Sequence, residues 1–168
     1  MSNWRIEIKE EFEKWIVEAV PEIKFFKDWN NDKLKSETET HAEIGIAFEY
    51  SSVGYDSSYL LQNNVDYAAK VPVVVTIHIL FSTFNDESQN CAYDYANKVV
   101  CSVAGRKTEH MNDNIKKMSE IEDTDHRGLY DYQITFGFTI NEAISRGGLD
   151  TTNIDFEVTG IIERGLGV

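Results

Sequence analysis

The chain has 168 residues, of which 42% are hydrophobic and 12% aromatic. This is enough apolar material for one core, so we expect a single folded domain over residues 1–168 and exclude a disordered chain. The 29 acidic and 16 basic residues give a net charge of -13, which repels phosphate backbones and argues against direct nucleic-acid binding. No apolar stretch approaches the roughly 20 residues needed to cross a bilayer. The start lacks an export signal. We therefore expect a soluble intracellular protein without a membrane partner.

The first expected element is an amphipathic helix over residues 4–20, which Pro21 ends. Residues 22–41 are predicted to form a turn and a loop, because a short apolar patch is followed by a polar run. Residues 43–50 alternate between apolar and smaller or charged side chains, which predicts a strand with one buried face.

Residues 51–70 combine tyrosines with Ser, Asn, Asp and Gly, and this composition predicts a long connection. Tyr55, Tyr59 and Tyr67 lie among small polar residues, a combination that suits protein contacts. We therefore treat these three as a candidate interaction loop. An ordinary ordered surface segment remains the alternative interpretation.

Residues 73–81 are β-branched and largely apolar on both faces, which predicts a central strand. His78 lies within it, and no second His or Cys is found at ligand spacing. We interpret His78 as a hydrogen-bonded sheet histidine without a chemical role.

A second helix is expected between the possible N-caps Asn85 and Asp86 and the C-terminal stop Gly105. Cys91 and Cys101 lie on it about 15 Å apart along the axis at roughly 1.5 Å per residue, too far for a disulfide. We interpret both as reduced core residues, as expected in a cytoplasm.

The C-terminal part is predicted to contain a hairpin, with strands over residues 115–122 and 129–140 and a turn over residues 123–128. A helical turn within residues 141–150 and a last strand over residues 154–163 follow. The predicted fold is thus α+β, with a mainly antiparallel sheet of about five strands and two principal helices packed on it.

The densest polar cluster could in principle hold a divalent cation through oxygen ligands. Its spacing differs from that of a calcium loop, and in a hairpin many of its carboxylates would point apart, so we favour a solvated turn. No nucleophile or phosphate-binding motif is present. We therefore predict no catalytic, metal-binding or cofactor-binding residues and no cofactor, while a carboxylate pair assembled by folding, as in a hydrolase, stays open. The cluster comprises Glu120, Glu122, Asp123, Asp125, His126 and Asp131.

The element order, with EIEDTDH at residues 120–126 and LYDYQITFGF at residues 129–138, resembles the tail-completion (tail terminator) proteins of long-tailed bacteriophages and prophages. The resemblance covers about residues 73–140. It implies a non-enzymatic structural subunit that forms a homo-oligomeric ring, usually a hexamer, at the head-tail junction. The implied partners are the tail tube and head-side connector proteins, and the implied locations are the cytoplasm of the bacterial host during assembly and then the virion. The alternative is a small-ligand or partner-binding α+β module with a pocket beneath residues 55–67.

Overall fold

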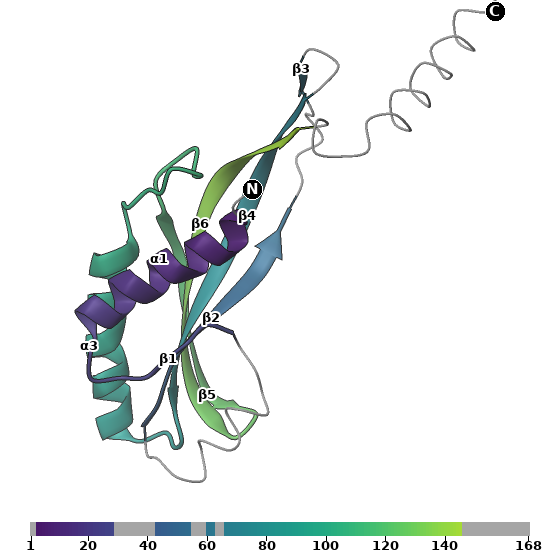
Figure 1. Cartoon of the computed structure of the whole chain (residues 1–168). Coiled ribbons are helices and arrows are strands. Elements are labelled where there is room, and N and C mark those ends of the chain that lie inside the picture. Colours follow the sequence, from purple (N-terminus) through teal and green to yellow (C-terminus); the bar gives the residue numbers. More distant parts are fainter. Residues whose placement is uncertain (1–2, 29–42, 55–59, 63–65, 146–168) are drawn as a thin grey trace, which may run out of the picture.

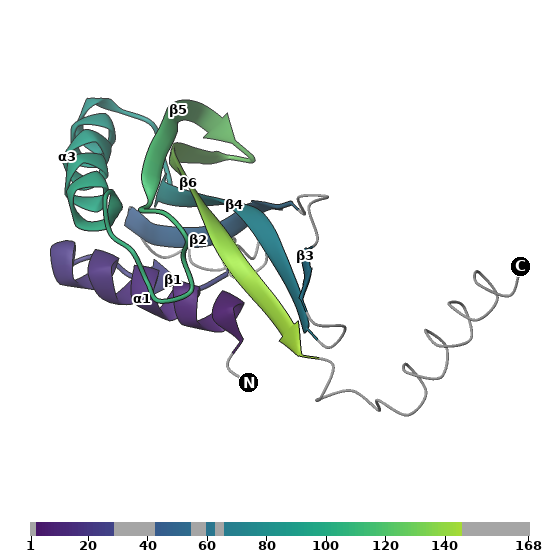
Figure 2. The same ribbon diagram turned by 90° about the horizontal axis from the view of Figure 1, so that it is seen from above.

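The helices α1 and α3 cover one face of a twisted sheet, and no helix of the described residues lies on the other face, called here the helix-free face (Figures 1 and 2). A computed structural model describes residues 3–28, 43–54, 60–62 and 66–145. The strand order is β1-β2-β4-β6-β5, with β3 pairing β4; β1 is parallel to β2, and the other pairs are antiparallel. The predicted α+β class with a mainly antiparallel sheet is confirmed. The elements are α1 (Trp4–Ala19), β1 (Phe25–Phe26), β2 (Glu43–Val53), β3 (Leu60–Gln62), β4 (Asp66–Phe81), α3 (Asp86–Val103), β5 (Lys116–His126) and β6 (Leu129–Ser145).

The helix α1 forms where the spacing of apolar residues predicts it. Asn3 caps its start, since the Asn3 side chain accepts a hydrogen bond from the backbone of Arg5 at 3.1 Å. Its buried side chains recur every three or four residues and therefore lie on one face. These residues are Trp4, Ile8, Phe12, Trp15 and Ile16.

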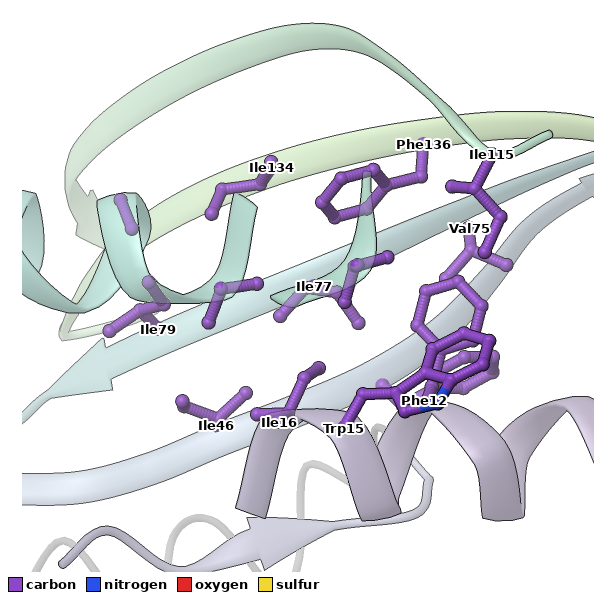
Figure 3. Close-up of a cluster of buried hydrophobic side chains, with 14 of the residues drawn as sticks. Phe12, Trp15, Ile16, Ile46, Val75, Ile77, Ile79, Ile115, Ile134 and Phe136 are labelled. Carbon is purple, nitrogen blue, oxygen red and sulfur yellow. The ribbon is translucent and has the colours of Figure 1, made fainter. Parts of the chain in front are cut away.

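The main core lies between the helices and the sheet (Figure 3). Phe12 of α1 contacts Phe48 of β2 and Phe136 of β6, with ring centroids 5.4 and 6.2 Å apart. The central strand β4 contributes Val75, Ile77 and other fully buried residues. Each such side chain stabilises the fold by roughly 1.5–3 kcal/mol relative to exposure, so this layer sets the position of the sheet.

The helix α3 begins and ends at the predicted residues. Asn85 and Ser88 form a reciprocal capping box, and Gly105 follows the last turn with a φ of 81°, a conformation that favours glycine. The assignment of both cysteines to the core is wrong for Cys101, which is exposed. Cys91 is partly buried and packs against the core, and the two cysteines form no disulfide. The buried face of α3 is centred on Tyr95 and Val99, and Cys101 lies outside it.

The strands β2, β4 and β6 are longer than their hydrophobic patterns predict. Residues 51–70 were expected to form a connection, but they contain the end of β2, all of β3 and the start of β4. Residues 141–145 continue β6 rather than forming a helical turn. The additional length comes from strand pairing, because β4 and β6 pair continuously from Asp66↔Ser145 to Phe81↔Tyr130. Pairing satisfies the backbone hydrogen-bonding groups of polar segments as well as those of apolar ones. The expected strand over residues 154–163 lies outside the described residues.

The hairpin that joins β5 to β6 has a tighter turn than expected. His126 pairs with Leu129, so only Arg127 and Gly128 form the loop, and both have positive φ angles of 56° and 85°. This is the backbone of a two-residue type I′ turn, whose twist matches that of the strands. Residues 123–126 therefore belong to β5. No helix among the described residues is long and apolar enough to cross a membrane.

Candidate functional site: the helix-free face and the β5 edge

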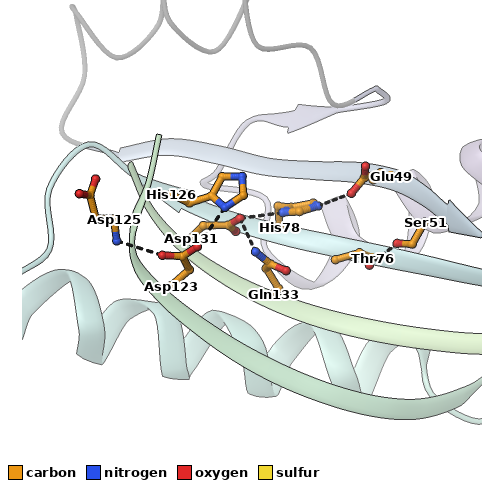
Figure 4. Close-up of polar contacts among 9 residues, drawn as sticks. All are labelled: Glu49, Ser51, Thr76, His78, Asp123, Asp125, His126, Asp131 and Gln133. Carbon is orange, nitrogen blue, oxygen red and sulfur yellow. Dashed lines mark hydrogen bonds and ion pairs between the residues drawn. The ribbon is translucent and has the colours of Figure 1, made fainter. Parts of the chain in front are cut away.

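The helix-free face of the sheet carries a buried polar cluster that joins three strands (Figure 4). Nδ1 of His78 on β4 lies 2.9 Å from Oδ2 of Asp131 on β6, and Nε2 of His78 lies 2.9 Å from Oε2 of Glu49 on β2. Gln133 donates from Nε2 to the same Asp131 oxygen at 2.9 Å. His78 is 4% exposed and Asp131 is fully buried. The prediction of a hydrogen-bonded sheet histidine is confirmed.

The carboxylates of Asp131 and Glu49 shift the pKa of His78. Burial by itself lowers the pKa of His78, but the hydrogen bond and negative charge of Asp131, followed by those of Glu49, outweigh it and raise the pKa above its ordinary value. When the ring is protonated, each of its N–H groups faces a carboxylate acceptor. This arrangement stabilises the contact between β2, β4 and β6.

The cluster lacks the geometry of a nucleophilic catalytic site within the described residues. Both ring nitrogens of His78 face carboxylates, so neither faces a hydroxyl. The Ser51 hydroxyl instead contacts Thr76. One polar atom of the cluster makes no hydrogen bond with the described residues: Oδ1 of Asp131, which is buried.

The acidic residues of the predicted polar cluster do not converge on one point. Glu120 and Glu122 lie on the helix-facing side of β5, where they accept hydrogen bonds from the hydroxyls of Tyr132 and Tyr130 at 2.6 and 2.8 Å. Asp131 lies on the opposite face of the sheet. The expectation that a hairpin separates these carboxylates is met.

Hydrogen bonds lower the pKa of three carboxylates of β5, those of Glu120, Glu122 and Asp123. Lys117 and then Tyr132 lower the pKa of Glu120, and Gln89 and then Tyr130 lower the pKa of Glu122. His126 lowers the pKa of Asp123, whose Oδ2 lies 3.0 Å from Nδ1 of His126. These contacts stabilise the hairpin and its packing on α3.

The strand β5 is the edge of the sheet and is exposed over nearly its whole length. Met118 is 60% exposed and Ile121 is 54% exposed. Ile121 pairs with Gln133, and Met118 lies against Gly137, so both side chains lie on the helix-free face. No strand among the described residues covers the outer edge of β5, which leaves backbone donors and acceptors available for pairing. The sequence predicts a strand over residues 115–122, but it does not predict that this strand lies at an edge of the sheet.

The opposite edge of the sheet is also only partly covered. The two-residue strand β1 pairs with β2 at Ile46 and Ala47. Within the described part of the chain, no strand lies beside β2 after Ala47. The sheet thus has two different edges, one formed by β5 and one by the later residues of β2.

The candidate interaction loop is not tested by these contacts. Tyr55 and Tyr59 lie outside the described residues. The backbone of Tyr67 belongs to β4 and pairs with Leu61 and Ile144, and nothing is described of its side chain. The assignment of these tyrosines to protein contacts therefore stays a prediction.

No protein-family model matches the sequence, and a comparison with curated proteins gives no match. Among solved structures, a chain of the virion of the native gene transfer agent (GTA) particle is similar over 80% of this chain and 94% of its own length. The TM-score is 0.47 and the sequence identity is 6%. A likeness of this strength identifies neither a family nor a function.

Proposed function

We propose that the chain is a non-enzymatic structural subunit of a phage-like particle, and that it forms the tail terminator ring at the head-tail junction. The observation that carries this proposal is the uncovered edge of β5, with Met118 and Ile121 exposed beside it. A long uncovered edge invites pairing with another chain, and natural proteins normally protect it. Assembly is one way of protecting it.

The two uncovered edges suit a ring rather than a two-fold dimer. A cyclic assembly uses a heterologous interface, in which one surface of a subunit binds a different surface of the next. Here the edge of β5 would add to the later residues of β2 in a neighbouring copy, through backbone hydrogen bonds. Within one chain, the described residues of β5 and β2 do not pair with each other.

The net charge of -13 gives this proposal a specific salt dependence. Neighbouring copies repel one another, and the Debye length falls from about 10 Å at 0.1 M salt to about 3 Å at 1 M. Assembly should therefore strengthen as salt is added. The same charge favours partner proteins over DNA as the contacts of the ring.

Native mass spectrometry and negative-stain electron microscopy of the purified chain test the proposal. We expect a closed ring of one copy number, populated more at high salt, that also binds the end of a tail tube. A chain that stays monomeric at millimolar concentration and high salt, and does not bind tubes, would overturn the proposal.

A further inference from the structure

A second charged site lies on the other side of the sheet, between α1 and the connection from α3 to β5. A hollow of about 430 Å³ opens there and is lined mainly by charged side chains. Glu7, Glu10 and Glu11 come from α1, and Glu109 and His110 come from the connection. This hollow is built by the helical layer and shares no residue with the β5 edge.

Two carboxylates of the hollow point at one nitrogen atom. Oε2 of Glu7 contacts Nε2 of His110, and Oε1 of Glu109 lies 3.5 Å from the same nitrogen. A ring nitrogen carries at most one hydrogen, so two carboxylates here compete for one N–H. A cation bound between the ligand atoms could instead contact all three groups. The three ligand atoms lie within 4.8 Å of one another, as this requires.

The connection that carries Glu109 and His110 is held in place by its own contacts. Met111 is buried and bridges to Ile140 of β6, and the backbone nitrogen of Asn112 donates to the carbonyl of Thr139 at 2.7 Å. Asp113 accepts hydrogen bonds from both the backbone and the hydroxyl of Thr139, at 2.7 Å each. A rigid scaffold of this kind presents ligands in a fixed geometry.

The charge of the hollow favours a cation. Glu10 and Glu11 add two further carboxylates to those of Glu7 and Glu109. The basic side chains nearby have other contacts: Lys107 donates to the carbonyl of Asn112 at 3.1 Å, and the Arg106 guanidinium stacks on Trp15 at 5.1 Å. Four carboxylates thus line the hollow against one lysine.

We propose that Glu7, Glu109 and His110 bind one divalent transition-metal ion of the Zn²⁺ type. One imidazole nitrogen with two carboxylate oxygens is a ligand set that Zn²⁺ accepts, with water in the fourth position. Ca²⁺ and Mg²⁺ prefer oxygen ligands alone and should bind more weakly. The ion would join segments 103 residues apart in the sequence and fix α1 against the connection. This site is independent of the proposed ring.

Calorimetric titration of the untagged chain with Zn²⁺ tests the site. Cys101 is an exposed thiol and an alternative Zn²⁺ ligand, so the titration uses the Cys101→Ser chain as the parent. We expect one Zn²⁺ per chain, and Glu109→Gln or His110→Gln should weaken the affinity by about tenfold or more, since even outer-shell changes cost 10–100-fold. The Glu109 side chain is 85% exposed, so its replacement leaves the fold intact.

His126→Gln is the matched control, because His126 lies at the end of β5, does not line the hollow and should not contribute to Zn²⁺ binding there. A nuclear magnetic resonance spectrum of the imidazole nitrogens supplies a second readout, in which Zn²⁺ shifts His110 alone. The proposal is wrong if the parent binds no stoichiometric Zn²⁺, or if Glu109→Gln and His126→Gln bind Zn²⁺ as the parent does. Either result leaves the ring proposal unaffected, since that depends on oligomer mass.

Discussion

Nδ1 of His78 lies 2.9 Å from Oδ2 of Asp131, and both side chains are buried between neighbouring strands of the sheet. The pair is diagonal, because His78 lies opposite Gln133 and Asp131 lies opposite Leu80. A buried charge without its partner is costly, so each residue depends on the other. The pair therefore fixes the register of β4 against β6 in addition to the backbone ladder.

Asp131→Ala should destabilise the fold by about 3–5 kcal/mol, because it leaves His78 without its buried counter-charge. Glu49→Ala is the matched control, since it removes the other carboxylate on the same ring. The Glu49 side chain is 42% exposed, so water can replace it and the loss should stay within about 1 kcal/mol. Urea unfolding measures both values. Equal losses in the two variants would show that the buried pair has no special role.

The raised pKa of His78 predicts how stability depends on pH. A group whose pKa is higher in the folded chain contributes its full stabilisation below its unfolded pKa, about 6.5, and loses it as the pH rises through the folded value. Asp131 and Glu49 are the carboxylates that hydrogen-bond to the ring. The free energy of unfolding of the wild type, minus that of His78→Gln, should therefore decrease as the pH rises from about 6.5 through the folded pKa of His78. A difference that stays constant or rises with pH would contradict this assignment.

The hydroxyl of Tyr130 should stabilise β5 through Glu122, to which it donates at 2.8 Å. Tyr130→Phe removes this bond and should cost about 1 kcal/mol at neutral pH. Because the pKa of Glu122 is lowered in the folded chain, its contribution is present above about pH 4.3 and is lost as the pH falls through the folded value. The cost of Tyr130→Phe should accordingly shrink in acid. Chemical unfolding of the wild type and of Tyr130→Phe at pH 7 and pH 3 measures this cost. If the cost is the same at both pH values, the hydroxyl stabilises the fold through packing and not through Glu122.

Two glycines on the sheet should respond differently to alanine. Gly45 has a φ of 143°, and an added Cβ would lie 2.4 Å from the carbonyl oxygen of Lys24. Gly45→Ala should therefore cost about 1–3 kcal/mol or more and disturb the pairing of β1 with β2. At Gly137 the added Cβ would meet only the flexible end of Met118, so Gly137→Ala should change stability by about 0.5 kcal/mol or less. Thermal unfolding of both variants tests this, and similar melting temperatures would refute it.

The hydrophobic periodicity of the sequence predicts elements better than it predicts burial. It finds α1, α3 and β6, because their apolar residues repeat with the period of the element. It places Asp131 on the polar face of β6 but gives no sign that this residue is fully buried. The burial of Asp131 involves His78 of another strand, which lies 53 residues earlier in the chain.

The length of a strand and its position at an edge of the sheet both depend on which strands pair. The polar start of β4 has the composition of a loop, and its pairing with β3 and β6 makes it a strand. The parallel strand β1 consists of two phenylalanines, too short for any alternation to be seen. Met118 and Ile121 show an apolar character in the sequence, yet their exposure follows from the position of β5 at the edge.

The edge of β5 is the centre of the proposed function, and charge placed beside it tests that role. The double variant Met118→Lys and Ile121→Lys puts two lysines on the exposed side chains next to this edge, a change that blocks edge-to-edge pairing. Ile6→Lys is the matched control, because Ile6 is 55% exposed on α1, in the helical layer.

Sedimentation velocity of the three chains at equal concentration is the most direct measurement. We expect the wild type and Ile6→Lys to form the same closed oligomer and the double variant to remain a folded monomer. If the double variant forms the same oligomer as the wild type, the edge of β5 is not the assembly surface and the account is wrong.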